Sequence, residues 1–417
     1  MAAQTSSERR SAERLVRSLT LAIFLQWLGA SAVLPLLPIY LRDRGGSDTV
    51  IGAVMAAYFV AALALQYPAG RLADRIGRRP VLIGGLLCYG AASVAFLLPV
   101  SPVGDIALRA AQGAGAGAAE VASLAMISAA VSIERRGRAF SSIYSGQLGG
   151  MAVGPLIGSL IGVSSMSIIF LVAGVMSVLA CIPVLADADL AQHGARPEDR
   201  TARLRRRLSF NRAMTGSLLA AAALGLTIGV YESTWTLLLE HRQAATWQIG
   251  LSWTLFAIPF VAFSRVGGRL ADRYDRRWLV FGALIVSVGF CCLYPFVTSV
   301  WWLLLLAPIE SSGFAIALPS AQSLLTQSAA PGETGRIQGL FSTSETAAIA
   351  LAAATGGALF GLHIWAPYVL WGAVGALLTA SVPFVWRPVA GRVSSAASRD
   401  ERVRQHPRAT DIAHQAP

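Results

Sequence analysis

The sequence predicts an all-α membrane protein in which twelve transmembrane helices form two similar halves of six helices each. Two observations carry this prediction: the composition and a long internal repeat. Hydrophobic residues make up 55% of the 417 residues and charged residues only 13%, whereas a soluble domain carries about 25% charged residues. Lipid is therefore the expected solvent for most of the chain.

The internal repeat is a charged motif of ten residues. Its first copy, residues 70–79, has the sequence GRLADRIGRR, and its second copy, residues 268–277, has the sequence GRLADRYDRR. The copies lie 198 residues apart and agree at eight of ten positions. Because this displacement is close to half the chain and too long for a solenoid, it indicates two similar halves.

Twelve apolar segments reach the length of about 20 residues that a bilayer crossing needs. They are residues 15–41, 48–70, 80–99, 104–131, 138–163, 164–186, 213–239, 246–269, 277–298, 300–329, 337–362 and 364–387. Six segments precede and six follow a polar stretch, so both copies of the motif are expected on the same face of the membrane.

The arginine distribution predicts the orientation. Arginines gather before the first segment, in both motif copies, in residues 187–212 and in the C-terminal tail, whereas the loops of the opposite face hold only Arg42, Arg44 and Arg242. By the positive-inside rule we expect a multi-pass protein of the inner (plasma) membrane with both termini in the cytoplasm. The net charge of +12 is then expected to meet anionic lipid, and nucleic acid is not an expected partner.

The expected organisation has four parts: an N-terminal half (1–186), a cytoplasmic linker (187–212), a C-terminal half (213–387) and a cytoplasmic disordered tail (388–417). The linker is either an amphipathic helix at the membrane surface or a solvated connector. The tail has no apolar face, which is typical of disorder.

Several chemistries lack their sequence patterns. The four cysteines, Cys88, Cys181, Cys291 and Cys292, lie in apolar runs and favour neither a disulfide framework nor a metal site. The glycine-rich residues 113–117 lie within an apolar segment with no strand before them, so a phosphate-binding loop is not expected. We expect no metal, no cofactor and no enzymatic activity.

Three motifs carry a resemblance to a known family. The first repeat copy resembles the signature of major facilitator transporters between helices 2 and 3, and the second lies where that superfamily keeps a degenerate version. Residues 109–113 (RAAQG) resemble the helix-4 motif of proton-coupled members. Residues 150–158 resemble the helix-5 motif of the antiporters, with Ser159 where a second glycine is usual. The chain therefore resembles the twelve-helix drug:proton antiporters, which are built from two parallel repeats.

This resemblance implies that the repeated motif is a conformational latch. Gly70 and Gly77 permit close approach and positive φ at the turn, and Asp74 is implied to accept hydrogen bonds from the start of helix 11, near residues 335–337. Arg78 is expected to pair with Glu134. A plain arginine-rich topological stop would explain the charges but not the repeated glycines and aspartates. The expected latch residues are Gly70, Asp74, Arg75, Gly77, Arg78 and Glu134, with Gly268, Asp272 and Arg273 in the diverged second copy.

Residues 138–163 carry a glycine at every fourth position from 146 to 162. Such residues share one helix face and let another backbone approach closely, and Pro155 indicates a bend. With the resemblance, Gly150, Gly154, Pro155 and Gly158 predict a moving contact between the halves, made with helix 8. Ordinary close packing is the alternative.

Ionisable side chains inside membrane segments are functional candidates because each costs about 2.5–3.5 kcal/mol at the bilayer centre. Arg109, Gln112 and Glu120 lie on one face of their segment, with Arg109 and Glu120 about 16 Å apart along the axis, too far to pair. Burial favours the neutral form of a carboxyl group, as a proton carrier requires; a glutamate satisfied by a neighbouring helix is the alternative. The candidates for proton or charge relay are Arg109, Gln112, Glu120, Glu232, Glu310 and Glu345.

Aromatic side chains accompany these carboxylates. Tyr231 and Trp235 are one helical turn apart, as are Glu310 and Phe314, and rings beside a carboxylate suit a lipophilic cation; simple packing is the alternative. In the superfamily, helices 1, 4, 7 and 10 line the central cavity. The cavity candidates are Gln26, Trp27, Tyr231, Trp235 and Phe314. The first segment has no acid, although many drug–proton antiporters keep one there.

These features predict a secondary active transporter that exports small lipophilic or cationic compounds in exchange for protons by alternating access. Its expected partners are a small-molecule substrate, protons and the lipid bilayer, and we expect a monomer. One alternative is an exporter or exchanger of an endogenous metabolite or lipid without proton coupling. Another is a non-transporting membrane sensor, against which the absence of a sizeable soluble domain argues.

Overall fold

The computed structural model describes residues 6–186, 212–327 and 334–405, and within these ranges it is helical with no strand, which confirms the predicted all-α class. The first half contains α1 (Ser6–Val33), α2 (Leu37–Asp43), α3 (Asp48–Ile76), α4 (Arg78–Ala95), α5 (Pro102–Ala130), α6 (Ile133–Ile161), the short η1 (Val163–Ser165), α7 (Met166–Leu179) and α8 (Cys181–Ala186). The second half contains α10 (Arg212–His241), α11 (Thr246–Arg273), α12 (Arg276–Leu293), η3 (Tyr294–Phe296), α13 (Val300–Gln327), α14 (Thr334–Leu362) and α15 (Ala366–Gln405).

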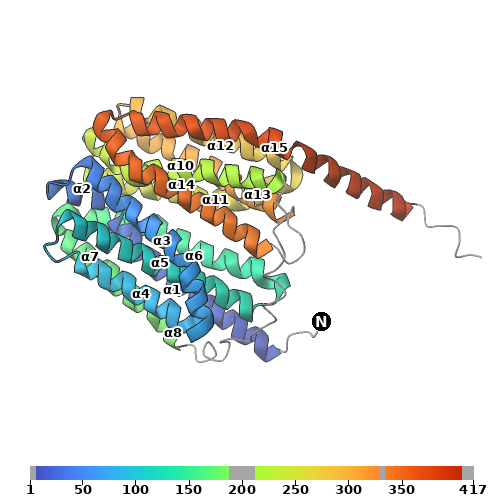
Figure 1. The fold of residues 1–417 in the computed structure, drawn as a ribbon, viewed down its shortest axis with the longest axis horizontal. Helices are drawn as coiled ribbons and strands as arrows, with labels where there is room; N and C mark the ends of the chain where they lie inside the picture. The colour runs from blue at the N-terminus through green and yellow to red at the C-terminus, as the bar shows by residue number, and fades with distance from the viewer. Residues whose placement is uncertain (1–5, 187–211, 328–333, 406–417) are drawn as a thin grey trace, which may run out of the picture.

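The helices run roughly side by side in one bundle (Figure 1). Eight stretches of the described residues are long and apolar enough to cross a membrane by length and composition. The other long helices, α4, α6, α11 and α13, pack alongside them, α4 on α5 and α6 on α1. With α1 joined to α2 and α7 to α8, the described residues contain twelve helical segments at the places where the sequence predicts twelve crossings.

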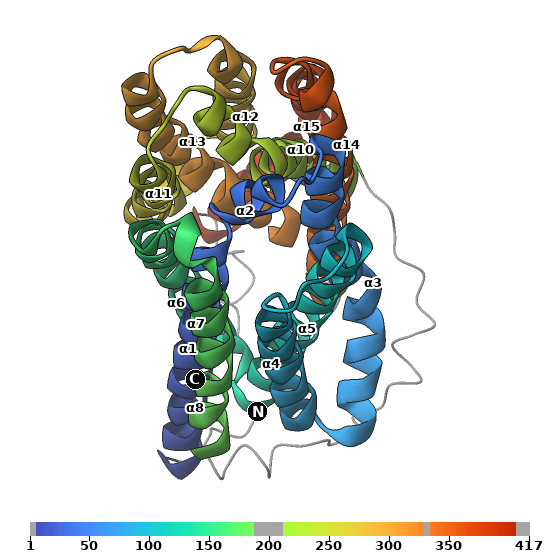
Figure 2. The ribbon, with the colours of Figure 1, turned by 90° about the vertical axis from the view of Figure 1, so that its left-hand side faces the viewer.

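The bundle has two ends, which we name after a residue at each. The Arg42 end holds α2, the start of α3 and the end of α10. The Gly77 end holds the turn between α3 and α4 and the start of α10. Figure 2 shows α2 lying between the two halves.

Hydrophobic burial joins the halves mainly at the Arg42 end. One buried cluster there combines residues of the first half, such as Leu37 and Ile51, with residues of the second, such as Leu238 and Phe360. The other two clusters of described buried residues each belong to one half, although the partly buried Leu148 reaches the edge of the second-half cluster. The halves are therefore sealed by a common core at the Arg42 end and have separate cores towards the Gly77 end.

Two helix pairs make the most extensive contacts between the halves, α3 with α14 and α6 with α11, and glycines bring each pair close. A Cβ atom at Gly52 would lie 2.9 Å from the backbone nitrogen of Gly357, and one at Gly250 would lie 2.5 Å from the carbonyl oxygen of Pro155 and closer still to Ser159. The repeat displacement of 198 residues relates Gly52 to Gly250 and Ser159 to Gly357. The two contacts are thus equivalent under the internal repeat.

Most of the first copy of the charged motif is helical, whereas the sequence suggests a loop. Helix α3 continues to Ile76 and α4 begins at Arg78, so the chain reverses at Gly77, whose φ of 101° and ψ of 152° confirm the predicted positive φ. Gly70 instead lies inside α3, where a Cβ atom would meet only Val121 Cγ1 at 3.5 Å. The expectation of a turn at Gly70 is wrong because the helix propagates through it.

The second copy turns by another device. Asp275, which replaces the glycine at this position, is the N-cap of α12: its carboxylate accepts a hydrogen bond from the backbone N–H of Arg277 (3.0 Å). The Arg277 guanidinium also pairs with it at 2.6 Å, and this hydrogen bonding lowers the pKa of Asp275. A capping carboxylate therefore takes the place of a positive-φ glycine.

Replacing Gly77 with alanine is expected to destabilise the protein by about 1–3 kcal/mol, because its backbone conformation is almost exclusive to glycine. Gly84→Ala in α4 is the matched control, since no atom lies within 4 Å of its Cβ position and φ is not positive. Thermal unfolding of both variants in detergent measures the difference. Equal melting temperatures would contradict the expected strain at Gly77.

The C-terminal region differs from the sequence prediction. Helix α15 continues to Gln405, although we expected a disordered tail from residue 388. The three alanines and four arginines between residues 388 and 405 favour helix intrinsically, which is consistent with a helix that has no apolar face. Residues 187–211 of the predicted linker and residues 406–417 lie outside the described residues.

Candidate functional site

A cavity of about 210 Å³ lies at the junction of the two halves. Residues of α1 and α6 line it from the first half, and residues of α10, α11, α13, α14 and η3 line it from the second. Six of the side chains predicted from the sequence share this cavity: Tyr231, Glu232, Trp235, Glu310, Phe314 and Glu345. Of the helices expected to line it, α5 contributes no lining residue.

Glu310 is the most fully bonded carboxylate of the cavity, and its side chain is 1% exposed. Its Oε1 accepts hydrogen bonds from Tyr231 (2.8 Å) and Ser287 (3.1 Å), and its Oε2 accepts one from Tyr294 (2.7 Å). These donors come from α10, α12 and η3. Glu310 therefore holds three parts of the second half together in addition to facing the cavity.

An aromatic wall accompanies this network. The rings of Tyr231 and Trp235 meet edge to face with centroids 5.7 Å apart, and Trp235 contacts Tyr294 at 4.9 Å. Phe256 of α11 and Phe314 of α13 form a second pair at 5.5 Å. Such rings present π faces and apolar area to a bound molecule.

Glu232 and Glu345 line the same cavity but differ from Glu310. The Oε2 atom of Glu232 is buried without a hydrogen-bond partner, and its carboxyl group interacts electrostatically with Arg109 of the other half. Glu345 interacts electrostatically with Glu120. The cavity therefore gathers three carboxyl groups, of which one is fully bonded by protein.

Arg109 and Gln112 lie inside the first half, outside the cavity lining. Arg109 is 3% exposed; its Nη1 donates to Gln112 Oε1 (2.8 Å), and its guanidinium lies 4.7 Å from the ring centroid of Tyr58. Gln112 Nε2 in turn donates to Ser93 Oγ (2.9 Å). This polar chain links α3, α4 and α5 and fixes the arginine.

Glu120, on the same helix, is exposed. Its carboxyl group interacts electrostatically with Tyr144 and with Glu345, both of which line the cavity. Glu120 itself is not among the residues that line the cavity. The structure thus separates Glu120 from the Arg109 chain, as their spacing predicts.

Two predicted cavity residues lie elsewhere. Gln26 is buried between α1 and α7, where its Oε1 accepts a hydrogen bond from Ser177 (2.6 Å). Trp27 packs at the edge of the first-half core. In this part of the chain the cavity is lined by Ser31 of α1, about one turn further along the helix, and by Leu34 in the turn that follows it. The prediction for Gln26 and Trp27 is wrong because it had the right helix but not its rotation and depth.

The glycine face of α6 packs on α1, within the first half. A Cβ atom at Gly150 would lie 2.7 Å from Leu28 N, one at Gly154 would lie 2.5 Å from Leu28 O, and one at Gly158 would lie 2.8 Å from Ala32 C. Helix 8 of the prediction is α11, and α6 does contact it, through Pro155 and Ser159. The predicted partner of the three glycines is therefore wrong, whereas Pro155 lies at the contact between the halves.

The latch prediction is described only in part. Asp74 lies in the last turns of α3, but residues 335–338 and the side chain of Glu134 are outside the described side chains, as are those of Gly268, Asp272 and Arg273. Arg75 is exposed and Arg78 begins α4. Beside them, Arg79 donates to the carbonyl oxygen of Leu185 at the end of α8 (2.7 Å).

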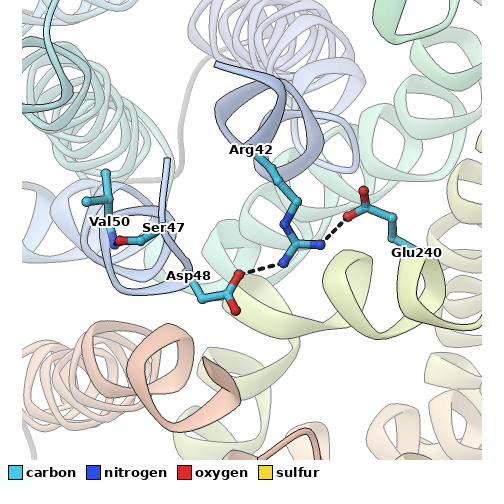
Figure 3. Close-up of polar contacts among 5 residues, drawn as sticks. All are labelled: Arg42, Ser47, Asp48, Val50 and Glu240. Atoms are coloured by element: carbon cyan, nitrogen blue, oxygen red, sulfur yellow. Dashed lines mark hydrogen bonds and ion pairs between the residues drawn. The ribbon is translucent and has the colours of Figure 1, made fainter. Parts of the chain in front are cut away.

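An ionic bridge closes the Arg42 end, and sequence reasoning missed it. Arg42 Nη1 lies 2.7 Å from Glu240 Oε2, and its Nη2 lies 2.5 Å from Asp48 Oδ1 (Figure 3). Arg42 belongs to the first half and Glu240 to the second, 198 residues away. This separation equals the repeat displacement, so corresponding positions of the two halves meet each other. That coincidence is the signal that could have revealed the bridge.

Replacing Arg42 with glutamine is expected to widen the Arg42 end. The pair is about one-third exposed, and such pairs contribute only about 0.2–1 kcal/mol, so the open population should rise at most about fivefold. Spin labels at Thr49 and His241, both exposed and in opposite halves, report this as a longer component in the distance distribution. Arg17→Gln, which replaces an exposed arginine in the first part of α1, is the control. An unchanged distribution for Arg42→Gln would show that the bridge does not hold the closed state.

Comparison with known proteins agrees with this architecture. The family model described as Major Facilitator Superfamily matches residues 19–246 and 209–414. The inner membrane transport protein YajR of Escherichia coli K12 is 27% identical over 386 residues, covering 88% of this chain and 80% of that protein. The class G tetracycline resistance protein of Vibrio anguillarum is 28% identical over 395 residues, covering 89% and 96%. A solved POT family transporter in complex with a thioalcohol-conjugated peptide superimposes with a TM-score of 0.74 at 14% identity, covering 89% and 96%.

Proposed function

Because the chain belongs to the major facilitator superfamily, we propose that it is a proton-coupled secondary transporter that exports small lipophilic or cationic compounds by alternating access. The observation that carries the proposal is the cavity at the junction of the halves, where Glu232, Glu310 and Glu345 lie beside aromatic rings. Carboxylates and π faces together attract organic cations. The resistance protein to which the chain is similar supports an efflux role.

The positive-inside rule supports an orientation for this transporter. With the arginine-rich Gly77 end in the cytoplasm, both termini are cytoplasmic and the Arg42 end faces outward across the inner membrane. The shared core and the Arg42–Glu240 bridge then close the outer side, while the halves have separate cores towards the cytoplasm. In this orientation the structure corresponds to an inward-facing carrier.

Alternating access then has a definite structural meaning in this chain. The halves 1–186 and 213–387, joined by the linker 187–212, would rock about the glycine contacts of α3 with α14 and of α6 with α11. Opening the outer side would break the Arg42–Glu240 pair and divide the shared core. On the cytoplasmic side, the motif copy around Asp74 would then contact the second half and the copy around Asp272 would contact the first half. These contacts would stabilise the outward-facing state.

The proposal is tested with purified protein in liposomes and ethidium as the lipophilic cation. An imposed pH gradient together with a membrane potential should drive ethidium movement against its own gradient, since each proton charge crossing about 100 mV releases about 2.3 kcal/mol, and an uncoupler should abolish this movement. Movement that persists with the uncoupler would favour exchange without proton coupling. No movement of ethidium or of a panel of cationic and neutral compounds would favour a non-transporting role.

A further inference from the structure

The polar atoms that line the cavity differ in whether the protein already satisfies them. Tyr231 and Tyr294 donate to Glu310, and the Trp235 Nε1–H donates to Ser252 Oγ (2.9 Å). Among the described lining side chains, two atoms are buried without a partner: the Oε2 of Glu232 and the Nε1–H of Trp253. The first is an acceptor that carries charge when ionised, and the second is a donor.

A buried donor or acceptor without a partner is costly, about 1–3 kcal/mol, and calls for an explanation. Water can satisfy such atoms in an empty site, but a molecule that displaces the water must supply the same hydrogen bonds or lose affinity. The two atoms therefore specify what a tightly held occupant has to offer. It needs a cationic donor for Glu232 and an acceptor for Trp253.

The two residues that carry these atoms come from two helices that are joined by a hydrogen bond at the cavity wall. Glu232 lies on α10, and Trp235 lies one turn away on the same helix. The hydrogen bond from Trp235 to Ser252 joins α10 to α11 directly beside Trp253. The Phe256 and Phe314 pair lines the same cavity. An occupant that reaches both polar atoms thus has aromatic rings against its body.

We propose that Glu232 and Trp253 form a two-point recognition site for aromatic amines that also carry a carbonyl or ether oxygen. Glu232 receives the ammonium group, the Trp253 indole N–H donates to the oxygen, and the Phe256–Phe314 pair packs on the aromatic body. The inference rests on the proposed function, since it names the substrate class of that cavity. A cation without an acceptor meets one of the two requirements and binds more weakly.

Three related probes test the two points separately. 4-Benzoylbenzylamine has both the ammonium group and a carbonyl oxygen, 4-benzylbenzylamine replaces the carbonyl by a methylene, and 4-methylbenzophenone keeps the carbonyl without the amine. Equilibrium dialysis against full-length protein in lipid nanodiscs measures their dissociation constants. We expect the ketone amine to bind about fivefold more tightly than the methylene amine, the effect of one hydrogen bond.

Two variants assign the effect to residues. Trp253→Phe should bring the ratio of the two amines' dissociation constants to about one. The smaller ring area of phenylalanine affects both amines alike and leaves this ratio unchanged. Glu232→Gln should weaken both amines about tenfold or more, as expected for a hydrogen bond to a charged group, and leave 4-methylbenzophenone unchanged. Trp247→Phe, an exposed tryptophan outside the cavity lining, should keep the wild-type ratio.

Equal dissociation constants of the two amines for the wild-type protein would overturn the proposal without any variant. Failure of both amines to bind would overturn it as well. A fivefold ratio that survives in Trp253→Phe would overturn the assignment of the donor. Because the dialysis uses no proton gradient, these outcomes are independent of proton coupling. Loss of the uncoupler effect in liposomes would overturn the proposed function and leave the two-point site standing.

Discussion

Replacing Glu120 with glutamine is expected to abolish proton-driven transport while leaving the protein folded. Glu120 is exposed on α5 and interacts electrostatically with Glu345 of the other half. Glutamine has the same shape but binds no proton, so the variant loses one charge and little packing. Substrate exchange between the two sides, measured without a pH gradient, should continue in liposomes, whereas accumulation driven by the gradient should fall to background.

The controls for Glu120 separate coupling from structure. Glu13→Gln changes an exposed glutamate near the start of α1 and should leave accumulation unchanged. Glu310→Gln is a poor substitute, because three hydroxyl groups donate to that carboxylate and an amide cannot accept from all of them in the same way. Wild-type accumulation in Glu120→Gln would place the coupled proton elsewhere, with Glu345 as the next carboxyl group to replace.

The architecture was predictable because it depends on composition and on local sequence patterns. Low charge and long apolar segments predict helices in lipid, and the repeated motif at 70–79 and 268–277 predicts two halves. The positive φ of Gly77 follows from the need to reverse the chain between two long helices. Glu232, Glu310 and Glu345 were found because a carboxyl group in an apolar run has few structural reasons to be there.

The partners of these residues were less predictable, because they depend on how each helix is rotated against its neighbours. The spacing of Gly150, Gly154 and Gly158 shows that one face is smooth but not which helix covers it. Trp253 was missed because its importance comes from an indole N–H that its neighbours leave without a partner, a property of the packed structure. Gln26 has a polar side chain on a cavity-lining helix, yet it faces α7.

Gly158→Ala is expected to destabilise the protein by about 3 kcal/mol or more. A Cβ atom there would overlap the carbonyl oxygen of Ala32 and lie 2.8 Å from its carbonyl carbon. Because both are backbone atoms of α1, no rotamer change can relieve the overlap and the two helices have to separate. Thermal unfolding in detergent should show a large decrease in melting temperature, and transport should fall with the yield of folded protein.

Gly149→Ala is the matched control on the same helix. Its Cβ atom would touch the ring of Phe24 at 3.4 Å, a side chain that can move, and alanine is favoured over glycine in a helix by about 1 kcal/mol. Gly149→Ala should therefore be neutral or slightly stabilising. If both variants melt together, the glycines of α6 do not mark a backbone contact with α1. If Gly158→Ala is folded but fails to transport, the close packing of α6 on α1 is needed for the transport cycle as well as for stability.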